Sequence, residues 1–522
     1  MGNRYVISAG HPVTADAGRH AMECGGNAYD ALLSGWLASC LAEPVLTSPG
    51  GGGFAMVAPA SRKPRLYDFF TQTPRRANPE GHTYPLEADF GTTRQVFHLG
   101  AGSVATPGCV SGILAIHSEL GRLPFSECAA PARHLARDGL SLTGHAATLL
   151  DVVSNLYLAT PESTALFKSR ENSTGCLREG EIYHNQDFIT FLEMLEAEGE
   201  RWFYKGDVGR IIGDYCRDNG GHLTRDDFIH YRTQIREPLA IRRNGATVWL
   251  NPPPSMGGTL VAIGLLLSNH APGTVYPFNQ ASDWVDWIRP LRTMSSMRTP
   301  EGIGTMDPDD RRILHEMLLK WPRLEEAAGE LFPGAIDHLR TTGTTQISIM
   351  DAEGNEVSMT TSNGSGSAII PAGTGFMLNN MLGEEDLQPA GLHTWKPDQR
   401  LSSMMTPAIA HLGDGSRVAT GSGGSNRIRS TILQILRHLI DRRSSLKEAV
   451  EAPRLHWEGG ILHAEEGAMD LLQPLAAHLP WEFVTHPVPN LFFGGAHSVH
   501  GSPGGFFHGI GDPRRGGVTV SG

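Results

Sequence analysis

Cysteine, charged residues and long apolar runs are all scarce in this chain of 522 residues. Its six cysteines include no CxxC pair, so the common zinc and dithiol motifs are absent. No apolar run approaches the roughly 20 residues of a membrane-spanning helix. The opening stretch MGNRYVISAGHPVTAD lacks the apolar core of a secretory signal. We therefore expect a cytoplasmic protein with reduced core thiols and no membrane partner.

The balance of charge is acidic. The chain has 43 Lys and Arg residues against 55 Asp and Glu residues, a formal net charge of -12 at pH 7. An acidic surface repels phosphate backbones, so nucleic acid is not expected as a partner. With 40% apolar residues, the chain can bury a sizeable core. Its length predicts either several domains or one large layered unit.

Helical and extended patterns alternate along the first part of the chain. Between residues 14 and 43, apolar residues recur at helical spacing and are interrupted by Gly25 and Gly26, which predicts two packed helices. The glycine-rich stretch SPGGGGF (48–54) then precedes short strand patterns. Without the Lys-Ser/Thr of a phosphate loop, these glycines favour close backbone packing or a substrate-facing turn. Residues 105–340 are mostly helical in pattern.

The periodicity changes after residue 343. TQISIMD and NEVSMTT alternate apolar and polar residues around the turn DAEGN, which predicts a β-hairpin whose second strand ends at Ser362 and Asn363. A glycine-rich segment (421–425) precedes a predicted helix, and Asn426 is placed to cap that helix. The apolar face of this helix comprises Ile428, Ile432, Ile435, Leu436 and Leu439. Backbone amides at such a helix start attract negative charge.

The stretch TTGTTQ (341–346) allows two interpretations: a threonine-rich strand entrance or a cleavage site that releases a nucleophile. A threonine hydroxyl needs an adjacent base, and an N-terminal threonine carries one in its own amine. The bond between Gly343 and Thr344 would supply such a terminus, because glycine offers the least hindered carbonyl. Further hydroxyls and a possible oxyanion-binding turn accompany it: Ser362, Ser402, Ser403, Gly424 and Ser425.

These motifs together resemble the γ-glutamyltranspeptidase family. The resemblance runs in order through ECGGNAYDAL, PGGGGF, TTQISIMDAEGNEVSMTTSN, GFMLNN, LSSMMTP, TGSGGSNRI and DPRRGG, and so spans nearly the whole chain. It implies an α/β fold of the N-terminal-nucleophile hydrolase type, a four-layer αββα sandwich. It also implies self-cleavage into residues 1–343 and 344–522, which stay associated without a covalent link. No cofactor and no metal is expected.

The resemblance also assigns roles to individual residues. Thr344 would become the nucleophile, Ser362 would assist it, and the backbone amides of Gly424 and Ser425 would hold the oxyanion. The implied substrate-binding residues are Asn363, Glu384, Ser402 and Ser403. Ser362 stands where the family has threonine, so we expect slower maturation than with Thr at this position.

Other positions depart from the family pattern. In YDFFTQTP, Phe70 stands where the family has an arginine that binds the α-carboxylate of a γ-glutamyl group. Losing that bidentate contact costs several kcal/mol of substrate binding, on the order of ~2–5, unless another cation replaces it. Arg75 and Arg76 are either that replacement or ordinary surface arginines. Glu384 replaces a shorter aspartate, and Gln346 replaces a histidine.

The sequence thus predicts an acylase-like amide hydrolase or acyltransferase acting on a small-molecule amide, with Phe70 indicating a less polar acyl group. One alternative is a true γ-glutamyltransferase or glutathione hydrolase that uses Arg75 or Arg76. A second alternative is an uncleaved, inactive scaffold. Metal binding by His497 and His500 is less favoured, because no third ligand is spaced with them.

Overall fold

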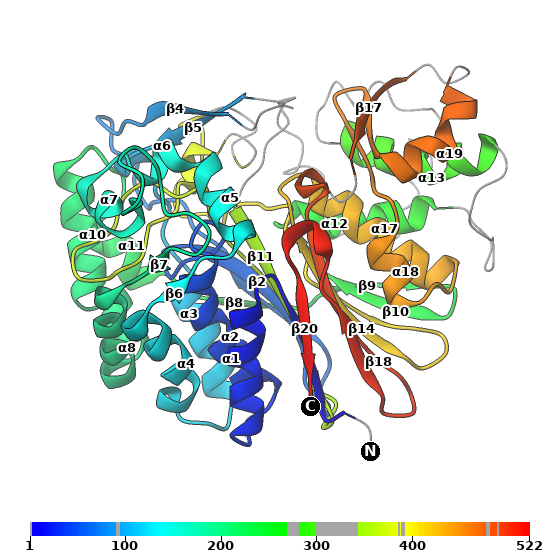
Figure 1. Cartoon of the computed structure of the whole chain (residues 1–522), viewed down its shortest axis with the longest axis horizontal. Coiled ribbons are helices and arrows are strands. Elements are labelled where there is room, and N and C mark those ends of the chain that lie inside the picture. The colour runs from blue at the N-terminus through cyan, green and yellow to red at the C-terminus, as the bar shows by residue number, and fades with distance from the viewer. Residues whose placement is uncertain are drawn as a thin grey trace.

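The computed structural model describes residues 3–89, 94–268, 281–297, 343–384, 387, 392–476, 481–487 and 490–522. Two β-sheets lie face to face between two layers of helices (Figure 1). The expected four-layer αββα sandwich is confirmed. Residues 269–280 and 298–340 of the predicted helical region lie outside the described residues, as do the first two threonines of TTGTTQ.

The first sheet mixes strands from before and after residue 343. Its order in the described residues is β20-β1-β11-β12-β2-β3-β8. The bounds are Val518–Ser521 for β20, Tyr5–Ala9 for β1, Gly343–Asp351 for β11, Glu356–Gly364 for β12, Gly52–Ala58 for β2, Arg65–Phe69 for β3 and Gln234–Arg236 for β8. The predicted hairpin is β11 and β12, and its two strands pair with β1 and β2, which precede the cleavage candidate.

The second sheet is also assembled from both parts of the chain, in the order β19-β18-β14-β13-β10-β9. Its strands are Phe507–Ile510 (β19), Gly495–Gly501 (β18), Arg417–Gly423 (β14), Ala408–His411 (β13), Ala246–Leu250 (β10) and Leu239–Arg243 (β9). Smaller sheets consist of β15 (Leu455–Glu458), β16 (Ile461–Glu465) and β17 (Glu482–His486), of β4 (Tyr84–Asp89) and β5 (Arg94–Leu99), and of β6 (Leu140–Ser141) and β7 (Ile182–Tyr183).

The two predicted N-terminal helices are α1 (Pro12–Glu23) and α2 (Ala28–Ala42). Asn27 and Asp30 form a capping box that starts α2 immediately after the glycine break. Every residue of α2 is buried, since α2 contacts α1, α4 and the first sheet. The chain therefore begins by building the outer helical layer of that sheet.

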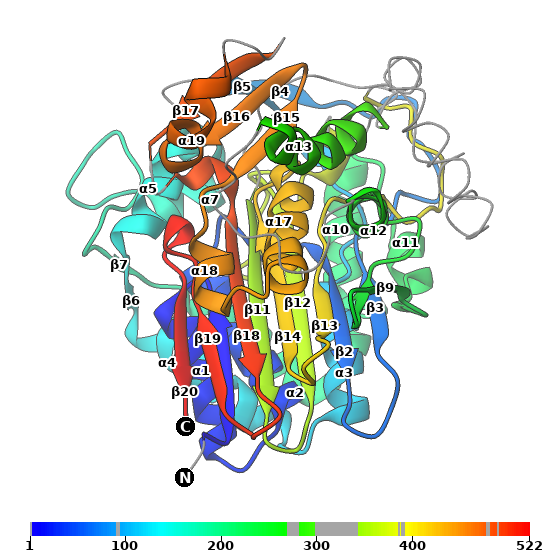
Figure 2. The same ribbon diagram turned by 90° about the vertical axis from the view of Figure 1, so that its right-hand side faces the viewer.

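Helices follow through the middle of the chain, as the pattern predicts within the described part. They are α3 (Cys109–Leu120), α4 (Phe125–Asp138), α5 (Gly144–Val152), α6 (Ser154–Tyr157), α7 (Pro161–Phe167), α8 (Gln186–Glu198), α9 (Glu200–Tyr204), α10 (Asp207–Asp218), α11 (Arg225–His230), α12 (Met256–Leu267) and α13 (Ala281–Ser296). The last helices are α17 (Arg427–Asp441), α18 (Leu446–Glu451) and α19 (Glu466–Ala476). Figure 2 shows α17 and α18 in front of the second sheet.

Helix α17 lies where the pattern predicts it, and its predicted apolar residues are all buried. One detail of the prediction is wrong. Asn426 occupies the N-cap position, but its backbone is already helical (φ -57°, ψ -25°) and its side chain makes no capping hydrogen bond. A capping side chain needs an extended N-cap backbone to reach back to the first amides.

Strand alternation separates two buried environments around the hairpin. Ile347, Ile349, Val357 and Met359 belong to the apolar cluster under α1 and α2. The alternate residues face the second sheet and are polar except for Met350, which belongs to the apolar cluster on that side. The Gln346 amide nitrogen donates to the Ser348 and Ser358 hydroxyls at 2.9 and 3.0 Å. Such buried polar groups are tolerated because each is hydrogen-bonded.

The same network accounts for Gln346, which departs from the family pattern. Its amide oxygen accepts a 2.6 Å hydrogen bond from Thr360, and Ser358 donates onward to the carbonyl of Thr420 on β14 at 2.7 Å. A side chain at Gly421 would collide with the Gln346 amide. Gln346 therefore joins the two sheets, and the glycine opposite makes room for it.

The glycine-rich stretch before β2 packs closely against backbone. A Cβ at Gly50, Gly52 or Gly53 would lie about 2.5–2.6 Å from a backbone atom of Met377, Thr71 or Thr360 respectively. A Cβ at Gly51 would collide with the carbonyl of Ser362. Real Cβ atoms do not approach so closely, so these positions require glycine. The stretch supports the strand that carries Ser362.

The burial of the cysteines and the length of the helices bear on two predictions from the sequence, reduced core thiols and no membrane partner. All six cysteines are free, and five are buried, whereas Cys24 is exposed and is therefore not the core thiol expected from the sequence. None of the described helices is long and apolar enough to cross a membrane.

Candidate active site

The candidate cleavage bond lies where β11 enters the first sheet. Gly343 and Thr344 are its first residues, and both are buried. Gly343 is paired with Gly364 and Thr344 with Ser362, so the register shifts by one residue between them. Such a bulge bends the strand locally and redirects its backbone groups. Ser362 and Asn363 thereby come next to the bond.

Ser362 contacts the carbonyl of the candidate bond directly. Its hydroxyl donates a 2.5 Å hydrogen bond to the carbonyl oxygen of Gly343. The backbone N–H of Gly364 in turn donates to the Ser362 oxygen at 3.1 Å. A donor on a carbonyl oxygen polarises the carbonyl and stabilises the negative charge that forms there when the carbon is attacked.

The glycine at position 343 is required by space. A Cβ there would collide with the carbonyl oxygen of Val45 and would lie 2.6 Å from that of Gly364. The loop after α2 therefore presses on the acyl side of the bond. Only glycine fits, independently of how reactive its carbonyl is.

Asn363 directly follows Ser362 on β12, and Glu384 contacts Ser365 three residues beyond Ser362. The Asn363 amide nitrogen donates to the carbonyl of Met377 at 3.3 Å, and its Oδ1 has no hydrogen-bond partner among the described residues. Glu384 is buried, and its carboxylate accepts a 3.2 Å hydrogen bond from the hydroxyl of Ser365. The end of β12 thus carries the Asn363 amide, and the Glu384 carboxylate contacts Ser365 just beyond that strand.

Asn380 belongs to the same group and was missed by the sequence analysis. Its Oδ1 accepts the backbone N–H of Ser365 at 2.8 Å, and its Nδ2 is buried with no partner among the described residues. The motif GFMLNN contains two asparagines. Asn379 is structural, since it bonds the backbone of Ala105 and Gly50. Only the contacts of each amide separate their roles.

Gly424 and Ser425 form the turn between β14 and α17. Their φ angles of +118° and +50° are in the left-handed region, which is unusual for Ser425. A Cβ at the preceding Gly423 would collide with the carbonyl oxygen of Thr344, so this strand end approaches the cleavage candidate closely. A non-glycine residue held in this conformation is typical of functional turns. The predicted oxyanion-binding turn and Thr344 are thus adjacent.

Two buried ionisable side chains that the sequence analysis missed, Glu43 and Arg515, contact Thr345 and Thr344 respectively. The Glu43 carboxylate accepts hydrogen bonds from Thr345 at 2.7 Å and from Thr14 at 3.0 Å. Burial raises the pKa of Glu43 to about 7, against the hydrogen bonds and the charge of Arg515. The guanidinium of Arg515 donates to the carbonyl of Thr344 at 3.5 Å. Burial lowers its pKa to about 10, while Asp512 and Glu43 oppose that shift.

Both residues left signals in the sequence. Glu43 is the C-cap residue of the entirely buried helix α2. A carboxylate at the end of an apolar run is rarely buried without a hydrogen-bonding or charged partner. Arg515 lies in DPRRGG, which was recognised as a motif without a role for the arginine.

The paired serines have different environments. The Ser403 hydroxyl accepts the backbone N–H of Met405 at 3.1 Å, and its carbonyl accepts from Ser255 and Gly257. The Ser402 hydroxyl is buried and has no partner among the described residues. Ser403 therefore helps to fix the loop, whereas Ser402 retains a hydroxyl for another molecule.

Phe70 is buried, and its ring stacks on Phe54 with 5.4 Å between ring centroids. Its carbonyl accepts a 2.7 Å hydrogen bond from Tyr231. Arg75 is held on the surface by Asp226 at 3.3 Å and Asp398 at 3.1 Å. These ion pairs occupy the guanidinium, which favours the surface interpretation of this arginine.

Arg76 is exposed, like a surface arginine. His497 and His500 lie on β18, and neither belongs to a group of three potential metal ligands within the described residues. The His497 ring instead accepts the backbone N–H of Asp512 at 3.3 Å, and His500 lies against His508 at 4.6 Å between ring centroids.

Gly343 and Thr344 lie buried at the head of a strand inside an αββα sandwich, and this sandwich is the N-terminal-nucleophile hydrolase type of fold that the sequence predicts. The fold agrees with solved structures. The cephalosporin acylase from Bacillus halodurans superimposes with a TM-score of 0.81, covers 99% of this chain and 96% of its own, and is 22% identical.

A family model described as gamma-glutamyltranspeptidase matches residues 14–521, so the chain belongs to that family. It is 29% identical over 488 residues to the acylase ACY 1 proenzyme of Pseudomonas sp. strain SE83, covering 89% of this chain and 84% of that protein. It is 26% identical over 535 residues to the glutathione hydrolase proenzyme of Escherichia coli K12, covering 98% and 90%. The chain is an enzyme of a family of acylases and glutathione hydrolases.

Proposed function

We propose that this enzyme cuts its own backbone between Gly343 and Thr344 and then uses Thr344 as the nucleophile of an amide hydrolase or acyltransferase. The observation that carries the proposal is the 2.5 Å hydrogen bond from Ser362 to the Gly343 carbonyl in the unbroken chain. It holds the bond in a polarised state before cleavage. The names of both relatives as proenzymes agree with this maturation.

In the cleavage step, the Thr344 oxygen attacks the carbonyl carbon of Gly343. The hydroxyl proton passes to the departing nitrogen of Thr344, the C–N bond breaks, and an ester links Gly343 to the threonine oxygen. Water then hydrolyses this ester, which leaves a carboxylate on Gly343 and a free amine on Thr344. Ser362 donates to the oxygen that carries negative charge in both steps.

The mature reaction repeats this chemistry on a substrate. The free amine of Thr344 accepts the proton of its own hydroxyl as the oxygen attacks the substrate amide. The backbone N–H groups of Gly424 and Ser425 bind the oxyanion. The amine part of the substrate then leaves and takes up the proton from the Thr344 amine. Water or a second amine then releases the acyl group from Thr344. The scheme requires no cofactor.

The substrate is a small amide whose polar groups meet Asn363, Glu384, Ser402 and Ser403. The side-chain oxygens of Asn363 and Ser402 have no hydrogen-bond partner among the described residues, which supports contact with a ligand, because buried polar atoms are otherwise paired. Phe70 replaces the family's carboxylate-binding arginine. The acyl group is therefore less polar than γ-glutamyl.

The mature enzyme consists of residues 1–343 and 344–522, associated without a covalent bond. All six cysteines precede Thr344, so no disulfide can connect the two fragments. The interleaved strands of both sheets hold them together, since β11 lies between β1 and β12.

A true glutathione hydrolase is the second candidate, favoured by the match to the Escherichia coli protein. That function requires a cation for the α-carboxylate, and the ion pairs of Arg75 argue against that residue. Hydrolysis of a γ-glutamyl anilide, compared with an aliphatic acyl anilide, distinguishes the two. A higher kcat/KM on the γ-glutamyl compound would make glutathione hydrolase the favoured function instead of acylase.

The maturation is tested by intact mass and N-terminal sequencing of the wild type, Thr344→Ala and Thr345→Ala. We expect the wild type and Thr345→Ala to give two fragments of about 37 and 19 kDa, their shares of 56.4 kDa. The smaller fragment should begin TTQIS in the wild type. Thr344→Ala should remain one chain. A wild type that remains uncut would instead favour the inactive scaffold.

A further inference from the structure

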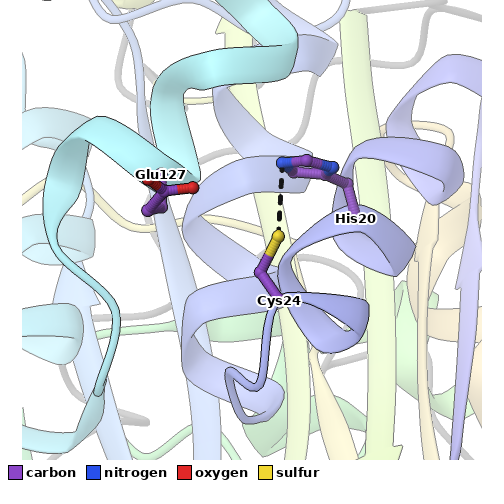
Figure 3. Close-up of side chains that lie close together, drawn as sticks. All are labelled: His20, Cys24 and Glu127. Carbon is purple, nitrogen blue, oxygen red and sulfur yellow. Dashed lines mark hydrogen bonds between the residues drawn. The ribbon is translucent and has the colours of Figure 1, made fainter.

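A second group of reactive side chains lies on the outer helical layer, where α1 ends and α4 begins. His20 and Cys24 are one helical turn apart at the end of α1, and Glu127 is in the first turn of α4. Figure 3 shows the three side chains gathered between the two helices. One ligand atom from each lies within 4.8 Å of the other two.

The spacing within this group matches tetrahedral zinc. The His20 Nε2 and the Cys24 sulfur are 3.6 Å apart. With Zn–S near 2.3 Å and Zn–N near 2.0 Å, a tetrahedral angle separates the two ligand atoms by about 3.5 Å. The four-residue spacing puts both on one face of the helix. A carboxylate oxygen from Glu127 completes three protein ligands of the types that zinc accepts.

A neighbouring trio, Asp30, His117 and Cys128, is closed by its own hydrogen bonds. Asp30 accepts the backbone N–H groups of Asn27, Arg122 and Leu123 at 2.8 to 3.0 Å and lies 3.2 Å from the His117 ring. Burial raises the pKa of the Cys128 thiol to about 12. This carboxylate has no free position for an ion, and this thiol resists the deprotonation that metal binding requires.

The outer group differs in access. Cys24 is the exposed cysteine of the chain, and Glu127 is exposed as well. A pocket of about 450 Å³ adjoins the group between α1 and α4, and Asp16, His20 and His134 contribute to its lining. An ion on the three ligands could therefore be reached from solvent, and its fourth position could hold water.

We propose that His20, Cys24 and Glu127 bind one Zn²⁺ ion, with a water molecule as fourth ligand. On binding, Cys24 loses its thiol proton to solvent and its sulfur bonds to the metal, while neutral His20 and ionised Glu127 contribute a nitrogen and an oxygen. The ion links the end of α1 to the start of α4. This site is independent of the cleavage proposed for Gly343–Thr344.

The test uses the purified full-length protein, stripped with chelator and titrated with Zn²⁺ in a calorimeter and with Co²⁺ in a spectrophotometer. We expect one ion per chain and a thiolate-to-cobalt charge-transfer band. Cys24→Ser should abolish the band, and Glu127→Gln should weaken zinc binding by about tenfold or more. His134→Gln is the matched control on the same pocket and should bind as the wild type does.

Circular dichroism of each variant establishes that it is folded before titration. The proposal is overturned by the absence of saturable zinc binding, by unchanged affinity in Cys24→Ser, or by one ion per two chains, which would indicate a bridge between molecules. Equal losses in His134→Gln and Glu127→Gln would also overturn it, because they would indicate non-specific binding to the pocket.

Discussion

Replacing Ser362 by alanine removes the only side-chain donor that the described residues offer to the carbonyl oxygen of Gly343. Loss of one such donor in a buried acyl-transfer site costs on the order of 10²- to 10³-fold in rate, about 2.7–4 kcal/mol. The N–H of Gly364 also loses its acceptor, which costs about 1–3 kcal/mol of folding stability. We therefore expect Ser362→Ala precursor to mature at least about 100-fold more slowly.

The assay follows precursor and fragments by gel densitometry after synthesis is stopped, and fits a first-order rate. Ser362→Thr is the matched control: it keeps the hydroxyl and should mature faster than the wild type. Thermal melting of Thr344→Ala, with and without Ser362→Ala, measures how much the Ser362 substitution lowers folding stability in chains that cannot be cut. A folded Ser362→Ala precursor that matures within about threefold of the wild type would refute the role of this hydrogen bond.

Three further predictions concern neighbouring contacts. Gly343→Ala places a methyl group against the Val45 carbonyl, so we expect an uncut or destabilised precursor, and normal cleavage with unchanged melting would contradict the close packing. Glu43 keeps its proton in the folded state up to about pH 7 but loses it near pH 4.5 when unfolded, so the free energy of unfolding should fall as pH rises through this window. Urea titrations at pH 5 and pH 8 give the free energy of unfolding at each pH, and Glu43→Gln should abolish the difference between them. An equal difference in the wild type and the variant would show that Glu43 is not its source. In uncut Thr344→Ala protein, Gln346→Ala should lose about 2–4 kcal/mol in urea unfolding, because it leaves the buried Thr360 hydroxyl without its acceptor and the Ser348 and Ser358 oxygens without a donor. A loss below about 0.5 kcal/mol would mean that the network contributes little.

Local pattern predicted much of the fold. The hairpin β11–β12, the helix pair α1–α2 and α17 follow from periodicity and turn residues, which are properties of adjacent positions. The sandwich itself followed from the family resemblance, because strand order in the sheets depends on contacts between distant parts of the chain. Pairing of β1 with β11 is of this kind, and no local signal encodes it.

The residues of the candidate site fall into the same two groups: those that a local motif reveals and those that depend on distant contacts. Gly343, Thr344 and Ser362 were found because they lie in one contiguous motif. Glu43 and Asn380 were missed because their significance depends on partners far away in sequence, Thr345 for one and Ser365 for the other. Gln346 was interpreted as an active-site departure, although its contacts are with the hydroxyls between the sheets.

Both sheets combine strands from before and after residue 343. This arrangement constrains the order in which the chain folds and cuts itself. Ser362 and Gly343 lie on one hairpin, but the loop at Val45 and the strand end at Gly423 pack against the same bond only when both sheets have assembled around it. Self-cleavage would therefore report that folding is complete, and a misfolded chain would stay intact. A mature pair, once denatured, would have to find its register again as two molecules, so unfolding of the cut enzyme should be far harder to reverse than unfolding of its precursor.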